Sequence, residues 1–135
     1  PLGAWEWTTL FGGDYSLGIA NVAVRPNGTI VVGEYHYNYF TPTFGSFTLT
    51  APNEAARDIA ILEMSQAGSF TSAQRIGTSG RGWSSIDDIT DLAIRPDGTL
   101  VMIGQTTSAT LTIGSRTIST INGSYNKRDL FIATI

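Results

Sequence analysis

The sequence contains no cysteine, so this chain can form neither a disulfide framework nor a thiolate metal site. It has a single lysine, Lys127, and a formal net charge of −3, which argues against partners such as nucleic acid or an anionic membrane surface. No apolar run approaches the roughly 20 residues of a membrane span. His36 is the only histidine, and no Gly-x-Ser-x-Gly motif frames a nucleophile. From these absences we predict that the protein is not an enzyme and binds no cofactor.

What is present is the composition of a folded chain. Hydrophobic residues make up 41% of the sequence and charged residues 14%, with 15 glycines, as in a chain that buries a core. The length of 135 residues suits one domain or a short repeat array. The chain starts at Pro1 without methionine or a signal peptide, which we interpret as the result of processing or excision.

One stretch is written twice. The sequence AVRPNGTIVV at residues 23–32 returns as AIRPDGTLVM at residues 93–102, 70 residues later. In each copy apolar residues flank a Pro-Asn/Asp-Gly turn, in which proline presets φ and glycine accepts the positive φ that closes the turn. Each copy therefore predicts a β-hairpin, and the duplication predicts a repeat protein.

The remaining segments also match in pairs. Residues 44–49 match 113–118, residues 58–64 match 129–135, and residues 3–12 match 68–77. Aligning Gly33 with Gly104 indicates that one unit carries an additional residue, as a β-bulge would add. The pattern predicts strands throughout and almost no helix.

Two units of this kind resemble a known family. The order W-x-W-x-x-x-F-G-G, then A-x-x-P-D/N-G, then F-G, then D-hydrophobic-F/A-I-A is similar to bacterial seven-bladed-β-propeller-type repeats. The resemblance implies an all-β chain of two four-stranded blades, and a protein that is secreted or held at the cell surface. The expected layout is an orphan outer strand at residues 3–12, a first blade at 18–77 and a second blade at 86–135.

The second blade of this layout lacks its own outer strand. Two blades cannot close a ring, and an unpaired strand edge invites another chain. We therefore predict that the N-terminal strand of one copy completes the second blade of a neighbouring copy, head to tail, as a ring or as a filament. The alternative is that the chain is a piece of a longer array, in which flanking repeats supply these strands. The residues predicted to pair between chains are Trp5, Trp7, Phe11, Leu130, Ile132 and Ile135.

An aromatic strand distinguishes the first unit from the second. Tyr35, Tyr37 and Tyr39 would share one face of an extended strand, with His36 and Asn38 on the other. Such a ladder could bind a glycan or a protein, as in a lectin-like propeller. The alternative, which we favour, is that the ladder packs within the protein.

The acidic cluster Asp87, Asp88 and Asp91 could hold Ca²⁺ through carboxylate oxygens, although it lacks EF-hand spacing. The preferred alternative is a turn at the entry to a strand, with carboxylates bonded locally. The enzyme alternative would be a hydrolase that uses His36 with an aspartate in a cleft. The sequence favours instead a non-enzymatic extracellular or surface module for self-assembly, adhesion or recognition.

Overall fold

The two Pro-Asn/Asp-Gly turns each close a hairpin in the computed structural model. The structure describes residues 3–4, 6–11, 17–37, 41–50, 56–77, 85–121 and 127–135. Gly28 and Gly98 have φ values of 84° and 86°, and their amides donate to the carbonyl oxygens of Arg25 and Arg95 at 2.8 and 2.9 Å. Both turns thus use glycine where a positive φ is required.

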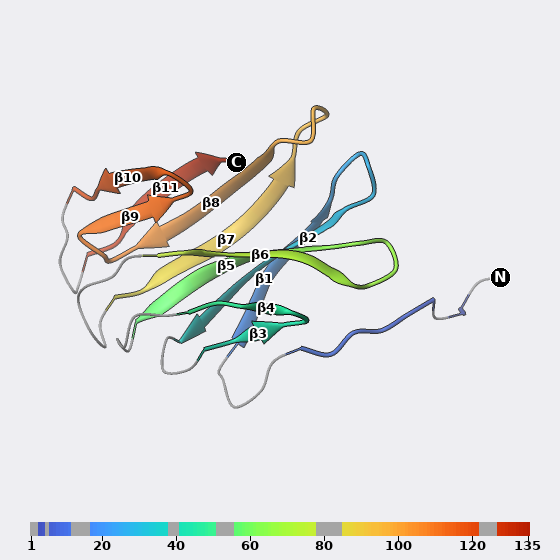
Figure 1. Cartoon of the computed structure of the whole chain (residues 1–135). Helices are drawn as coiled ribbons and strands as arrows, with labels where there is room; N and C mark the ends of the chain where they lie inside the picture. Colours follow the sequence, from blue (N-terminus) through green and yellow to red (C-terminus); the bar gives the residue numbers. More distant parts are fainter. Residues whose placement is uncertain are drawn as a thin grey trace.

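The first sheet has four antiparallel strands in a simple meander (Figure 1). Its order in space is β1-β2-β5-β6. Between β2 and β5 the chain makes a small hairpin of two short strands. The strands are β1 (Leu17–Val24), β2 (Ile30–Tyr37), β3 (Thr43–Phe44), β4 (Phe47–Thr48), β5 (Arg57–Met64) and β6 (Phe70–Ile76).

The second sheet repeats this plan with three strands, in the order β11-β8-β7. A small hairpin again separates its second and third strands. Within the described residues no strand lies on the far side of β11. The strands are β7 (Asp87–Ile94), β8 (Leu100–Thr106), β9 (Thr110–Ile113), β10 (Arg116–Ser119) and β11 (Asp129–Thr134).

The strand registers correct the alignment of Gly33 with Gly104, because neither hairpin carries an additional residue relative to the other. Asn21 pairs with Gly33, and Asp91 pairs with Ile103, so the offset of 70 holds through both hairpins. A β-bulge precedes the pair in both sheets. Gly33 therefore corresponds to Ile103. The alignment of the two glycines was misleading, because each glycine makes room for a different neighbouring side chain.

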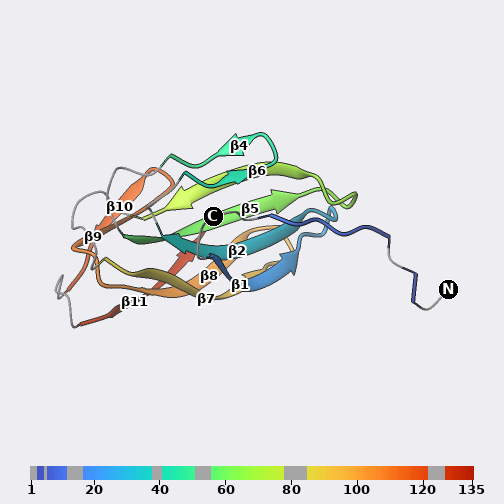
Figure 2. The same cartoon turned by 90° about the horizontal axis from the view of Figure 1, so that it is seen from below.

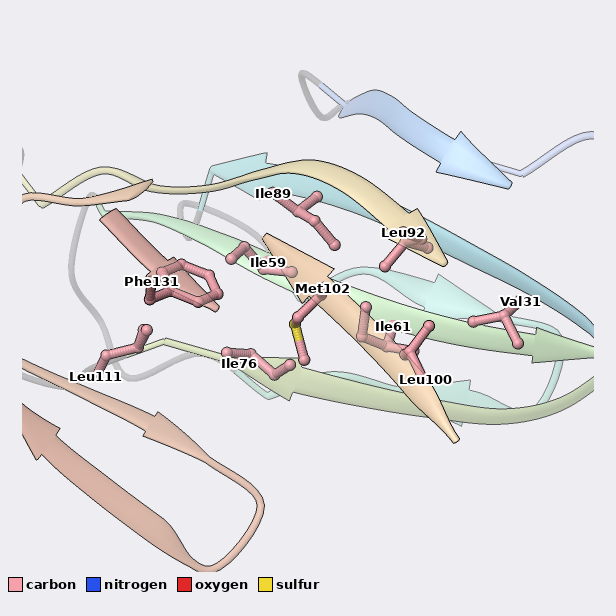
Figure 3. Close-up of a cluster of buried hydrophobic side chains, with 10 residues drawn as sticks. All are labelled: Val31, Ile59, Ile61, Ile76, Ile89, Leu92, Leu100, Met102, Leu111 and Phe131. Atoms are coloured by element: carbon pink, nitrogen blue, oxygen red, sulfur yellow. The ribbon is translucent and has the colours of Figure 1, made fainter. Parts of the chain in front are cut away.

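The two sheets stack face to face, and the β3–β4 hairpin covers the opposite side of the first sheet (Figure 2). We call the side of the first sheet that faces the second sheet its forward face. The forward face of the second sheet is the equivalent side, which points away from the first sheet. The opposite side of each sheet is its rear face. A first apolar core fills the space between the sheets (Figure 3). A second lies between the first sheet and the β3–β4 hairpin.

Every element of the described residues is a strand, a turn or an extended segment. The prediction of an all-β chain is therefore confirmed. No helix that could cross a membrane occurs in the described part of the chain.

Candidate assembly surfaces

The contact between the two sheets is the best-defined interface in the molecule. The forward face of the first sheet meets the rear face of the second, and side chains from both interdigitate (Figure 3). Burying each large aliphatic side chain contributes about 1.5–3 kcal/mol. The buried members are Val31, Ile59, Ile61, Ile76, Ile89, Leu92, Leu100, Met102, Leu111 and Phe131.

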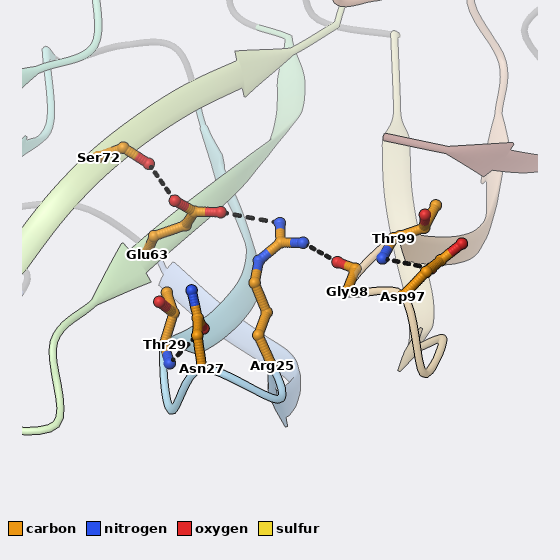
Figure 4. A network of polar contacts seen from close by, with 8 residues as sticks. All are labelled: Arg25, Asn27, Thr29, Glu63, Ser72, Asp97, Gly98 and Thr99. Carbon is orange, nitrogen blue, oxygen red and sulfur yellow. Dashed lines mark hydrogen bonds and ion pairs between the residues drawn. The ribbon is translucent and has the colours of Figure 1, made fainter.

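Polar contacts fix the register of this interface. Figure 4 shows Arg25 between the two sheets, where it donates to the Gly98 carbonyl oxygen of the second sheet and, at 2.8 Å, to Glu63 of the first. At the innermost strands, Nδ2 of Asn21 donates to Oδ1 of Asp91. These charged and amide groups allow one relative position of the sheets, since apolar packing alone is not directional.

The forward face of the second sheet is apolar and uncovered. Leu130 and Ile132 are 79% and 74% exposed, with Ile103 beside them. The strand pairings place Leu130 and Ile132 where Ile59 and Ile61 stand in the first sheet. Ile59 and Ile61 are buried, because the second sheet covers them. Nothing in the described residues covers the second sheet in the same way.

The rear face of the first sheet is also partly uncovered. Val22 and Val24, on the innermost strand β1, are 57% and 59% exposed. At the offset of 70, Val22 corresponds to Leu92, which is buried against the first sheet, and Val24 corresponds to Ile94, which is partly buried against the same core. The chain therefore exposes, at its two ends, both halves of the interface that it buries in its middle.

The free edge of β11 borders a groove of about 420 Å³ beneath the β9–β10 hairpin. In the first sheet β6 lies along the corresponding edge, where Phe70 contacts Phe44 of the β3–β4 hairpin. A strand equivalent to β6 would lie in this groove. Its lining residues are Leu111, Ile113, Arg116, Ile118, Ile132, Ala133 and Thr134.

The outer strand predicted for residues 3–12 is not formed in the single chain: the described residues 3–4 and 6–11 include no strand. Residues 6–11 run past the β3–β4 hairpin, much as β6 runs past β9 (Figure 1). Nε1 of Trp7 donates to the Gln66 carbonyl oxygen at 2.6 Å, and Phe11 packs edge-on against Phe44 and Phe70. Only side chains hold the segment, and no backbone–backbone hydrogen bond joins it to another described residue. Trp5 lies outside the described residues.

The two described residues of the tyrosine ladder, Tyr35 and Tyr37, contact an arginine of the same chain. The Arg57 guanidinium lies over the rings of Tyr35 and Tyr37, 4.4 and 5.9 Å from their centroids, and also pairs with Asp88 of the second sheet. This arrangement supports the packing interpretation over a ligand surface. Asn38 and Tyr39 lie outside the described residues.

His36 is fully buried, on the rear face of β2. Its Nδ1 lies 2.8 Å from Oε1 of Glu34, which is also fully buried. Burial raises the pKa of the Glu34 carboxyl, and the hydrogen bond to His36 opposes this shift. Because neither group reaches solvent, neither a ligand nor a substrate could contact His36 in this conformation.

The three clustered aspartates point to separate partners. Asp88 pairs with Arg57, and Asp91 accepts from Asn21. Buried Asp87 accepts from the hydroxyls of Thr106 and Ser108 at 2.5 and 2.9 Å. Among the described residues no group of three metal-ligating side chains is arranged to hold an ion. The three carboxylates therefore bond to residues of other strands and of the other sheet, and not within a turn at the strand entry as the sequence predicted.

Asp87 makes stability depend on pH. Burial raises the pKa of its carboxyl from 3.8 to about 6, with smaller increases from Asp58 and Asp88. The charged form is therefore disfavoured in the folded chain, by about 3 kcal/mol at neutral pH. This penalty disappears as pH falls from about 6 to about 4, because the folded chain then takes up a proton before the unfolded chain does.

We expect Asp87→Asn to raise the free energy of unfolding by about 1–3 kcal/mol at pH 7.5, and this gain to fade toward pH 4. Urea unfolding at pH 7.5, 5.5 and 4 measures it. Asp97→Asn is the matched control: Asp97 is exposed, and its pKa is lowered by hydrogen bonds from Thr99. A gain from Asp87→Asn that did not change with pH would contradict the assignment.

Comparison with known proteins adds no relative to these observations. No family model, no curated protein and no solved structure matches the chain.

Proposed function

We propose that this chain is a β-propeller-type repeat module that assembles head to tail with copies of itself, outside the cell or at its surface, without catalysing a reaction. Each sheet is then one blade, and each junction between copies repeats the junction inside the chain. The contact is heterologous, so it either closes into a ring or continues as a filament.

One observation carries the proposal: the chain exposes both halves of its own internal interface. The uncovered forward face of the second sheet corresponds, residue for residue, to the face that the first sheet buries. The exposed Val22 corresponds likewise to a buried leucine. A neighbouring copy offers the equivalent positions for both faces, and the internal interface supports the proposal as a precedent for the way in which such faces pack.

Strand donation is the second part of the proposal. The groove of about 420 Å³ borders the free edge of β11, and residues 6–11 have a backbone that is not bonded to another described residue. In a head-to-tail pair the segment of one copy would add to the β11 edge of the other, and backbone hydrogen bonds would satisfy both. The bacterial propeller-type repeat pattern supports four strands per blade. The proposed function includes no catalysis, because the side chain of the single histidine, His36, is fully buried.

The proposal is tested with two variants that each lose one face. Val24→Glu places a carboxylate on the rear face of the first sheet, and Leu130→Glu places one on the forward face of the second. Both positions are exposed, so both variants should fold, but burial of an unpaired charge at a junction is costly. We expect each variant alone to be monomeric, and an equimolar mixture to form a 1:1 pair with twice the 14.4 kDa of one chain.

Light scattering coupled to size exclusion measures these masses. Ala67→Glu, at an exposed turn between β5 and β6 away from both faces, is the control and should assemble as the original chain does. A wild-type chain that stays monomeric at high micromolar concentration would reject the proposal, and so would a mixture of the two face variants that forms no pair.

A further inference from the structure

The polar contacts of the internal interface have counterparts that are left without a cross-sheet partner. At the offset of 70, Arg95 takes the place of Arg25 and Asp91 takes the place of Asn21. Arg25 reaches forward to the Gly98 carbonyl oxygen. The guanidinium of Arg95 is exposed and has no hydrogen-bond partner among the described residues.

Asp91 is placed to bind on both sides. It accepts from Asn21 of the first sheet, and it also lines a shallow depression of about 160 Å³ on the uncovered forward face, with Ala93, Val101 and Ile103. A carboxylate can accept several hydrogen bonds, and an asparagine amide has two N–H donors. One Asn21 amide can therefore bridge two Asp91 carboxylates, one from its own chain and one from a neighbour.

We propose that Arg95 and Asp91 are the residues that fix the register of a second copy on this face. Arg95 donates to the Gly28 carbonyl oxygen of that copy, and Asp91 accepts from Nδ2 of its Asn21. This inference rests on the proposed head-to-tail assembly and names the contacts that specify it. Around the assembly the innermost strands then present asparagine and aspartate alternately, so that no two carboxylates face each other directly.

A third internal contact has no counterpart, which supplies a control. Arg57 of the first sheet pairs with Asp88 of the second. At a junction between copies, Arg128 would stand in place of Arg57, and it would face Gly18, the counterpart of Asp88. Glycine offers no carboxylate, so Arg128 gains no ion pair there, whereas Arg95 gains a charge-assisted hydrogen bond.

The 1:1 pair of face variants allows each substitution to be placed on one side of the junction only. The Val24→Glu chain contributes its second sheet to that junction, and the Leu130→Glu chain contributes its first. We expect Arg95→Ala in the Val24→Glu chain to raise the Kd of the pair about tenfold. The same substitution in the Leu130→Glu chain should leave the Kd unchanged, as should Arg128→Ala in the Val24→Glu chain.

Asp91 is tested in the same pair. Asp91→Ala removes the internal contact with Asn21 in whichever chain carries it, but only in the Val24→Glu chain does it also remove the contact between copies. We expect Asp91→Ala to give a several-fold higher Kd in the Val24→Glu chain than in the Leu130→Glu chain. Sedimentation velocity measures each Kd, and urea unfolding of each chain alone checks that folding is intact.

The outcomes separate the two proposals. If the pair of face variants does not form, head-to-tail assembly is rejected, and this inference with it. If the pair forms but Arg95→Ala and Asp91→Ala raise the Kd equally from either chain, these residues do not specify the junction. The same holds if Arg128→Ala raises the Kd as much as Arg95→Ala. Either result overturns only the inference about Arg95 and Asp91.

Discussion

Deletion of residues 1–11 is expected to weaken association between copies by about a thousandfold. The segment would form about four backbone hydrogen bonds along β11 of the neighbouring copy. Each contributes about 1 kcal/mol net, and 1.4 kcal/mol corresponds to a tenfold change in Kd. The loss should exceed that of any single side chain at the junction.

The effect should depend on which chain carries the deletion. In the pair of face variants, the Leu130→Glu chain is the one that donates its N-terminal segment, so the deletion there should abolish the pair at micromolar concentration. The same deletion in the Val24→Glu chain removes a segment that contacts no partner, and the Kd should not change. Light scattering at several concentrations distinguishes the two placements.

The deletion also removes Phe11 from the aromatic cluster with Phe44 and Phe70. Phe11→Ala in the Leu130→Glu chain separates this contribution, because it removes the ring and keeps the backbone. We expect it to weaken the pair much less than the deletion does. Association that survived the deletion would leave docking of the faces in place and reject strand donation.

The largest expected loss of stability comes from Gly104, beneath the edge strand β11. A Cβ at this position would overlap the Asp88 carbonyl oxygen and lie 2.6 Å from the ring of Phe131. The main-chain overlap cannot be relieved by a rotamer change, so Gly104→Ala should cost about 3 kcal/mol. Since Phe131 seats β11 on the core, the same substitution should also weaken assembly.

Gly114→Ala is the matched control for this loss. Gly114 has a φ of 59°, and a Cβ there would meet no atom within 4 Å, so only backbone strain of about 1 kcal/mol is expected. Urea unfolding measures both variants. Adding Phe131→Ala should not rescue Gly104→Ala, because the Asp88 carbonyl oxygen remains. A cost for Gly104→Ala no larger than for Gly114→Ala would show that the site relaxes freely.

The candidate surfaces were only partly predictable from the sequence. The edge residues Leu130, Ile132 and Ile135 followed from the missing outer strand, because strand order can be inferred from a repeat. Val22, Val24 and Arg95 did not, although the duplication contains them. Their importance depends on a difference in exposure between equivalent positions, which requires knowing which face of each sheet is covered.

The sequence alone determined the repeat, the turns and the strands of the two sheets, but not the state of residues 6–11, which form no strand in the single chain. These follow from local chemistry: Pro-Asn/Asp-Gly fixes a turn within four residues, and alternation of apolar side chains fixes a strand. The matching of third strands, such as Asp58 with Asp129, followed from the same repetition.

Only the tertiary structure decided which faces are buried and what the polar residues do. Glu34 and His36 are polar residues that flank Tyr35 in the sequence, and they are buried together in the first sheet. Gly33 and Gly104 look equivalent, yet each makes room for a different side chain of another strand: Leu92 for the first and Phe131 for the second. These outcomes depend on contacts between residues far apart in the chain, and no local pattern encodes such contacts.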